Sequence, residues 1–421
     1  MRTSAATNPS AAPITPVQPL SAPVPERAPV GVVLTGGGAR GAYQAGVISA
    51  LMDILDPHRD PNFKSPFSIV CGTSAGSINA AGLACYADAP HEGAERMRQL
   101  WGGLKTHDIF EADGGALLRT GWRWLATLSL GWMMPNLRRN IPHSLLNNTP
   151  LRRLLQRTID FDRLKANLHL RYLDALAITA TAYTTGEHLT FYQSEQKAIT
   201  PWHRSLRRAI PCRIGVDHLL ASSAIPFVFP AQAILVAGGI KWCGDGTMRQ
   251  LAPISPAIHL GAEKVVIIGT GFNDETYPDD HVTDPAYPSL AQIAGHTLSN
   301  IFLDSVAIDI ERMERINQLL SKLPPEVAQA QPLKQVSTFS ITPSQSIDEI
   351  AIKHYERMPR SARALFRVLG VSAKSGPTTG GSLISYLLFE SAFTQELIEL
   401  GRSDTMNRLE EVKAFFKESS Q

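Results

Sequence analysis

Cysteine is scarce in this sequence, and its cysteines form no pattern typical of a disulfide framework or a metal centre. The four cysteines, at positions 71, 85, 212 and 243, include no C-x-x-C pair and no cysteine/histidine spacing suited to a metal. Two of them lie in apolar runs. We therefore expect reduced, structural thiols in a cytoplasmic setting, and neither a metal nor another cofactor.

Excess charge and long apolar runs are lacking as well. The 40 Lys and Arg against 38 Asp and Glu give a net charge of +2, which predicts no general attraction to nucleic acid. No run approaches eighteen apolar residues, so we expect no transmembrane helix. Residues 1–28 are rich in Pro, Ala, Ser and Thr and lack the apolar core of a signal peptide. They predict a disordered tail, and secretion without a signal peptide stays open.

One segment carries a glycine-flanked serine. The apolar run Phe67–Cys71 leads into Gly72-Thr73-Ser74-Ala75-Gly76, and the small-residue stretch Ser77–Ala84 follows. This order predicts a strand, a sharp turn and a helix. The turn exposes the serine hydroxyl, and Gly72 and Gly76 avoid collisions with the neighbouring strand and helix. Ser74 is therefore a candidate nucleophile.

A second glycine cluster lies upstream. The predicted strand Val30–Thr35 leads into Gly36-Gly37-Gly38-Ala39-Arg40-Gly41 and a predicted helix from about residue 42 to 55. Consecutive glycines can turn backbone N–H groups into one concavity, which predicts an oxyanion hole. The letters also fit the dinucleotide pattern G-x-G-x-x-G. A dinucleotide site needs an acidic residue at the end of the next strand to bind the ribose. In this sequence the next strand ends in Cys71-Gly72, which disfavours nucleotide binding.

A third motif, Gly244-Asp245-Gly246, follows a hairpin predicted around Gly238-Gly239. Alone, such an aspartate is typical of a turn. It is preceded, however, by the run A-S-x-A-x-P-x-x-F-P at Ala221–Pro230.

The four pieces resemble the patatin-like phospholipases and occur in that family's order between Gly31 and about Gly271. The resemblance implies a three-layer α/β/α domain with a mostly parallel sheet, and a Ser-Asp dyad that hydrolyses acyl esters of lipids. It implies that Ser74 is the nucleophile and Asp245 its partner. The resemblance also implies that the oxyanion hole is formed by Gly36, Gly37, Gly38 and Arg40. The glycines that match the family's motifs are Gly41, Gly72, Gly76 and Gly246.

This assignment is chemically coherent. A serine hydroxyl needs a base, and the tetrahedral intermediate needs fixed donors around its anion. A carboxylate with an ordinary pKa near 4 is a weak base, so Asp245 must be desolvated or act mainly by orientation. The family usually has Gly or Ala after Asp-Gly. Thr247 stands there instead, and its β-branched side chain puts the local turn in doubt.

The stretch 114–171 combines tryptophans with basic residues. It holds ten Lys and Arg against two acidic residues, Asp160 and Asp162. Such a bias suits an interfacial, lipid-touching insertion, for instance a lid carrying Trp124, Arg138 and Arg139. A packed helical cap with solvated arginines explains it equally well.

Beyond the catalytic domain, predicted at 29–271, residues 272–421 predict a mainly helical C-terminal extension. We expect a helix at about 289–323, a strand at 336–341, and helical stretches at 355–369 and 382–416. The last carries an apolar stripe that favours core packing or a subunit interface. Homo-oligomerisation stays open.

The sequence thus predicts a phospholipase A or lysophospholipase acting through an acyl-serine intermediate, with a lipid substrate and a cytoplasmic or peripheral membrane location. Another serine hydrolase, such as a thioesterase, or a non-catalytic lipid-binding protein of the same fold are the alternatives. A Ser-His-Asp triad would require a histidine that follows the acid in the sequence. His259 is the best placed of the histidines after Asp245. We expect none to be catalytic.

Overall fold

The computed structural model describes residues 28–111, 144–196, 199–272, 304–331, 333–360, 363 and 381–417. The predicted tail 1–28, apart from its last residue, lies outside this part of the chain. So do most of the tryptophan-rich stretch and the start of the helix expected from residue 289.

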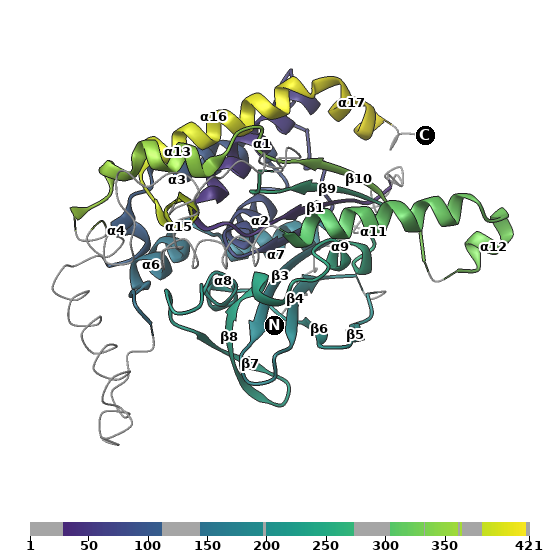
Figure 1. Ribbon diagram of the computed structural model, residues 1–421. Coiled ribbons are helices and arrows are strands. Elements are labelled where there is room, and N and C mark those ends of the chain that lie inside the picture. Colours follow the sequence, from purple (N-terminus) through teal and green to yellow (C-terminus); the bar gives the residue numbers. More distant parts are fainter. Residues whose placement is uncertain are drawn as a thin grey trace, which may run out of the picture.

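The described strands form one mixed, mostly parallel sheet of ten strands in the order β10-β9-β1-β2-β3-β4-β6-β5, and β8, followed by β7, pairs with the end of β3 (Figure 1). The predicted α/β class is confirmed. The strands are β1 (Val30–Leu34), β2 (Ile69–Thr73), β3 (Ala175–Ala182), β4 (His188–Ser194), β5 (His203–Arg204), β6 (Arg207–Pro211), β7 (Gln232–Val236), β8 (Gly239–Asp245), β9 (Lys264–Ile268) and β10 (Ser337–Ile341).

The central strands are apolar on both faces because helices cover both faces. Along β1, Val32 and Leu34 belong to the larger hydrophobic core, whereas Val33 belongs to the core on the opposite face. Such uninterrupted apolar runs are typical of buried parallel strands. The layers are therefore helix, sheet and helix.

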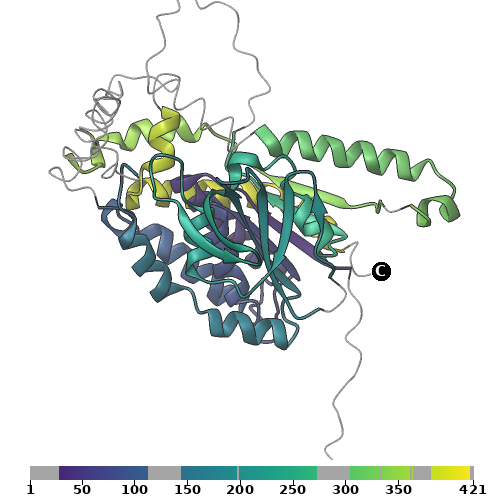
Figure 2. The ribbon, with the colours of Figure 1, turned by 90° about the horizontal axis from the view of Figure 1, so that it is seen from below.

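The larger core lies beneath α1, α2, α3, α16 and α17, and the smaller core beneath α9 and α11. Figure 2 shows α11 and α12 projecting beyond the sheet. The helices before residue 272 are α1 (Gly41–Leu55), α2 (Ala75–Cys85), α3 (Pro90–Gly103), α4 (Thr106–Ile109), α6 (Thr149–Thr158), α7 (Phe161–His169), α8 (Val216–Ser222) and α9 (Ser255–His259), with short 3-10 turns η1 (Gly38–Arg40) and η3 (Gly246–Arg249). After it come α11 (Asp304–Ser321), α12 (Pro325–Gln329), α13 (Ile347–His354), η4 (Tyr355–Arg357), α15 (Ser382–Leu387), α16 (Ser391–Asn407) and α17 (Leu409–Lys417).

The C-terminal helices pack directly on the N-terminal half of the chain. Helix α16 lies against α1 (Figure 1), and each helix presents a glycine to the other's backbone. A Cβ at Gly46 would overlap the Ile398 carbonyl, and one at Gly401 would overlap that of Tyr43. Close backbone approach of this kind requires glycine. The apolar stripe from Leu387 to Leu400 is buried in the larger core, which is one of the two alternatives that the sequence left open.

Two helix predictions were wrong in detail. The stretch 382–416 is three helices. The chain is extended around Glu390, which bridges to Lys105, and a turn at Arg408 separates α16 from α17. The stretch predicted as a helix from Tyr355 begins with one 3-10 turn and then extends at Met358; most of its remainder lies outside the described residues. The division into domains at residue 271 stays a prediction, and β10 extends the same sheet.

Candidate active site

Strand pairing brings Ser74 and Asp245 together. Strand β2 runs parallel to β3 and ends with Thr73 opposite Thr179. Strand β8 runs antiparallel along the same edge of β3 and ends with Asp245 opposite Ala180. Because β2 and β8 run toward each other and end opposite neighbouring residues of β3, the residue after β2 meets the last residue of β8.

Ser74 occupies the sharp turn that the sequence predicts. Its backbone has φ 55° and ψ −127°, a conformation rarely adopted by a residue with a side chain, and α2 begins at the next residue. The Ser74 N–H donates to Ser222 Oγ at 2.9 Å. The Ser74 hydroxyl donates to Asp245 Oδ2 at 2.7 Å. The strained turn therefore aims the hydroxyl at the carboxylate.

The motif glycines let backbones approach one another around this turn. A Cβ at Gly72 would overlap the Gly76 carbonyl, and one at Gly76 would overlap that of Leu34. A Cβ at Gly246 would overlap the Thr179 carbonyl. Glycine is thus a packing requirement at all three positions.

Asp245 is fully buried, and both of its carboxylate oxygens accept hydrogen bonds. Oδ2 accepts from Ser74, while Oδ1 accepts from the Thr247 N–H at 3.0 Å and from Thr247 Oγ1 at 2.7 Å. Burial raises the pKa of Asp245 to about 6, and the Thr247 and Ser74 hydrogen bonds oppose that rise. The buried carboxylate agrees with the desolvated alternative. Thr247 fits the η3 turn and binds the carboxylate, which resolves the doubt about this position.

Three further polar residues, Ser222, Thr179 and Gln250, support the turn. The sequence alone did not predict their roles. Ser222 lies in the Ala221–Pro230 run, which contributes to the family resemblance but does not by itself indicate a contact with Ser74. Thr73 Oγ1 lies 2.6 Å from Thr179 Oγ1 and accepts from Gln250 Nε2 at 2.8 Å. No local pattern marks Thr179 or Gln250 as neighbours of the serine.

The glycine-rich loop is held from both sides. Gly37 and Gly38 have φ values of 159° and 56°, and a Cβ on either would overlap a neighbour, Thr270 Oγ1 and the Tyr386 carbonyl respectively. The Gly36 carbonyl accepts from Thr270 Oγ1 at 2.6 Å. Gly38 lines the same cavity as Ser74, so the loop borders the predicted nucleophile.

Arg40 directs its side chain into the protein, toward the C-terminal helices. Its guanidinium donates to Ser385 Oγ at 2.9 Å and to Asp348 Oδ1 at 2.5 Å, and it lies over the Tyr386 ring. Its backbone N–H donates to the Gly37 carbonyl at 3.1 Å within the turn. Gly41 packs against the Trp101 ring and Ala75, where a Cβ would not fit.

An apolar cavity of about 40 Å³ reaches Ser74. Gly38 and Ser223 line it near the nucleophile, and apolar side chains of α2, α3 and α6 form most of its remaining wall. Phe389 also lines it, from the extended segment that interrupts the predicted C-terminal helix. The residues that line it are Gly38, Ser74, Ala75, Ile78, Leu100, Trp101, Leu104, Ile109, Leu151, Leu154, Leu155, Ser223, Ile225, Phe229 and Phe389.

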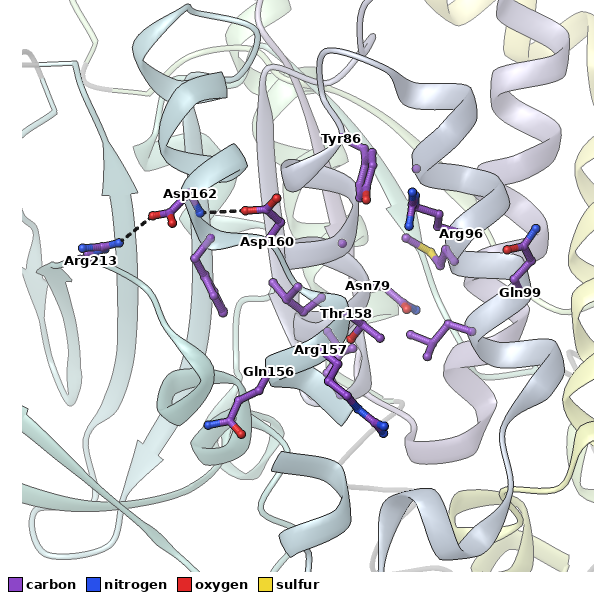
Figure 3. Close-up of a pocket in the computed structure, with 17 residues that line it drawn as sticks. Asn79, Tyr86, Arg96, Gln99, Gln156, Arg157, Thr158, Asp160, Asp162 and Arg213 are labelled. Atoms are coloured by element: carbon purple, nitrogen blue, oxygen red, sulfur yellow. Dashed lines mark hydrogen bonds and ion pairs between the residues drawn. The ribbon is translucent and has the colours of Figure 1, made fainter. Parts of the chain in front are cut away.

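Beside this cavity lies an open groove of about 820 Å³ between α2 and α3 on one side and α6 and the start of α7 on the other (Figure 3). The described part of the basic stretch contributes α6 and α7 here, and Arg152 pairs with Asp217. Trp122, Trp124, Trp132, Arg138 and Arg139 lie outside the described residues, so the lid stays a prediction.

The two described histidines that follow Asp245 have partners away from the dyad. His259 Nδ1 lies 2.8 Å from the Ser255 carbonyl, and its ring stacks on Trp202. His354 Nε2 lies 2.6 Å from Glu396 Oε2. The other two histidines after the acid, at positions 281 and 296, lie outside the described residues.

The described residues show neither a metal centre nor a membrane span. Within those ranges, no group of three His, Cys, Asp or Glu residues is arranged to hold a metal ion. Of the helices that the structure describes, none has the length and apolar character needed to cross a membrane.

The chain is similar in sequence to a curated phospholipase. A cGAMP-activated phospholipase from Escherichia coli (strain TW11681) is 27% identical over 199 residues, which make up 47% of this chain and 46% of that protein. The chain thus spans slightly less than half the length of this curated relative.

Two solved structures are similar at 14% identity. VipD from Legionella pneumophila aligns with 92% of this chain and 67% of its own, with a TM-score of 0.35. The type III effector protein ExoU aligns with 88% and 53%, with a TM-score of 0.30. The family model described as "Patatin-like phospholipase" matches residues 32–258, which is more than half of the chain, runs from within β1 to within α9 and includes Ser74 and Asp245. The chain therefore belongs to the patatin-like phospholipases, a family of serine hydrolases.

Proposed function

We propose that the protein is a lipid acyl hydrolase of phospholipase A or lysophospholipase type that uses Ser74 as nucleophile and Asp245 as its base. The observation that carries the proposal is the 2.7 Å hydrogen bond from Ser74 Oγ to Asp245 Oδ2 in a strained turn. The apolar cavity beside Ser74 supports an acyl substrate.

In the first half-reaction, Ser74 Oγ attacks the ester carbonyl carbon while its proton passes to Asp245. The tetrahedral oxyanion is stabilised by the backbone N–H groups of Gly37 and Gly38 and by the N-terminal end of α2. The Arg40 amide donates within its own turn, which makes it a weaker candidate for this role. Collapse of the intermediate breaks the ester C–O bond, and the proton on Asp245 moves to the leaving alcohol.

In the second half-reaction, water attacks the acyl-serine. Asp245 accepts the water proton and returns it to Ser74 Oγ, which leaves a free fatty acid. With its pKa at about 6, Asp245 is mostly ionised at neutral pH and a stronger base than an ordinary aspartate. Ser222 and Thr247 hold the two partners in place without bonding to the substrate.

A fluorophosphonate probe combined with a panel of phospholipids and lysophospholipids tests the proposal. Wild-type protein should be labelled at Ser74 and should release fatty acid. Ser74→Ala should lose both, while Ser321→Ala, a serine at the exposed end of α11, should lose neither. If the probe labels Ser74 and the protein hydrolyses a thioester but no oxyester, the protein is a thioesterase. A folded protein that binds lipid without labelling would indicate a non-catalytic relative.

A further inference from the structure

The apolar cavity at Ser74 and the neighbouring groove share part of their walls. Ile78 of α2 and Leu100 of α3 line both. Helix α6 also contributes to both, with Leu151, Leu154 and Leu155 at the cavity and its last residues at the groove. Ile78 and Leu100 therefore stand between the cavity and the groove.

The cavity is too small to hold a long acyl chain by itself. Its volume is about 40 Å³, whereas the groove measures about 820 Å³. A cavity that holds a molecule as small as benzene measures about 150 Å³. Only the first carbons of an acyl chain fit beside Ser74, and a longer chain needs another space for its remaining carbons.

The groove has a mostly apolar floor and a polar rim. Tyr86, Met97 and Ile159 are buried in its floor, together with Asn79, whose side-chain amide is already hydrogen-bonded to Gly41, Gln44 and Trp101. The rim is formed by exposed side chains, among them Arg96 and Gln99 of α3 and Gln156 and Arg157 of α6 (Figure 3). Arg96 is already paired with Glu92, and Arg213 with Asp162. An apolar floor below solvated polar groups suits an alkyl chain better than a phosphate.

We propose that this groove binds the distal part of a long acyl chain, which enters between Ile78 and Leu100, and that these two side chains determine acyl-chain preference. The proposal rests on the proposed function, because it takes Ser74 as the point where the ester lies.

Gly82 lies one helical turn beyond Ile78 on α2 and lines only the groove. It lies eight residues after Ser74, about 12 Å along α2 at 1.5 Å per residue. An extended alkyl chain with C–C bonds of about 1.5 Å advances about 1.3 Å per carbon. Acyl groups of about ten or more carbons should therefore reach Gly82, and shorter ones should end before it.

Gly82 also offers a way to fill the groove without disturbing the core. A Cβ there would meet only Met97 Cε, at 3.7 Å, which is ordinary contact. Gly82→Leu therefore projects into the groove. Gly103→Leu is the matched control, since Gly103 is exposed at the end of α3, outside the groove, and a Cβ there would meet nothing within 4 Å.

The experiment measures kcat/KM for p-nitrophenyl esters from four to eighteen carbons, together with the melting temperature of each variant. For Gly82→Leu, turnover of the sixteen-carbon ester should fall about tenfold, by the scale of pocket discrimination. Turnover of the four-carbon ester should fall less than twofold. Gly103→Leu should change neither. If Gly82→Leu does not fold, Ile78→Ala replaces it, and should raise the ratio of long-chain to short-chain turnover.

The outcomes distinguish this proposal from the function on which it rests. If wild-type protein hydrolyses no ester, the proposed function fails. If it does, and Gly82→Leu lowers all chain lengths equally or none, the groove does not hold the acyl chain. A loss with a sixteen-carbon lysophospholipid, which has a single acyl chain, but not with the sixteen-carbon p-nitrophenyl ester would show that the groove takes the head group, which also overturns the proposal.

Discussion

Thr247 offers a direct test of the proposal that Asp245 acts as the base. Replacing it with Val keeps the shape but removes the hydroxyl that donates to Asp245 Oδ1 at 2.7 Å. A hydrogen bond to a charged group contributes about 1.5 to 3 kcal/mol, and one pKa unit corresponds to about 1.4 kcal/mol. The Thr247 N–H still donates to Oδ1, so we take the lower end of that range, a rise of about one unit.

The expected result is a displaced pH profile. The carboxylate must be ionised to accept the serine proton, so kcat/KM in the wild type should rise with pH through about 6, the pKa of Asp245. In Thr247→Val the rise should centre about one unit higher. Activity at pH 6 should then be about fivefold lower than in the wild type, whereas activity at pH 8 should be nearly equal.

Thr247→Ser keeps the hydroxyl and is the matched control, so its profile should stay near that of the wild type. The assay is kcat/KM on a short-chain ester between pH 4.5 and 9. A loss in Thr247→Val of the same size at every pH would mean that the hydroxyl only orients the carboxylate. A displaced profile in Thr247→Ser as well would refute the hydrogen-bond argument.

Three further predictions concern the dyad, the loop and the histidine. Ser74→Ala and Asp245→Asn should each lower hydrolysis by several powers of ten; residual activity above about a hundredth would contradict the assignment. Asp348→Asn should lower the free energy of unfolding by about 3 kcal/mol, because Arg40 is 3% exposed and would keep its charge without a counterion. Urea denaturation measures this loss, and an unchanged unfolding midpoint would show that water replaces the carboxylate. His259→Ala should leave kcat/KM within about tenfold, since its ring nitrogen bonds to the Ser255 carbonyl of its own helix, and a thousandfold loss would instead require a triad.

The local geometry of the site could be predicted because its motifs encode turns. Gly72 and Gly76 flank Ser74 where backbones nearly touch, and the order of strand, turn and helix leaves little choice for the serine. The hairpin before Asp245 was predicted from its two glycines, and β7 and β8 confirm it. Such signals lie within a few residues of the feature that they predict.

The rest depends on contacts between distant segments. Arg40 was expected to contribute to an oxyanion hole, and nothing near it in sequence indicates that its side chain is held by Asp348 and Ser385, more than 300 residues later. The break before α16 has no Gly or Pro within it. It follows from the bridge between Lys105 and Glu390 and the hydrogen bond from Thr106 Oγ1 to the Phe389 carbonyl. The apolar spacing continues through these residues, so the sequence predicts one uninterrupted helix over 382–416.

These contacts make the C-terminal helices part of the site rather than an addition to it. The Tyr386 carbonyl lies against Gly38 and leaves no room for a side chain there, and Asp348 and Ser385 hold Arg40 at the end of the same loop. Phe389 forms part of the wall of the cavity beside Ser74. The loop proposed to bind the oxyanion therefore owes its conformation to α13 and α15. Any change that loosens those helices should act first on the oxyanion and the acyl chain, before it disturbs the hydrogen bond between Ser74 and Asp245.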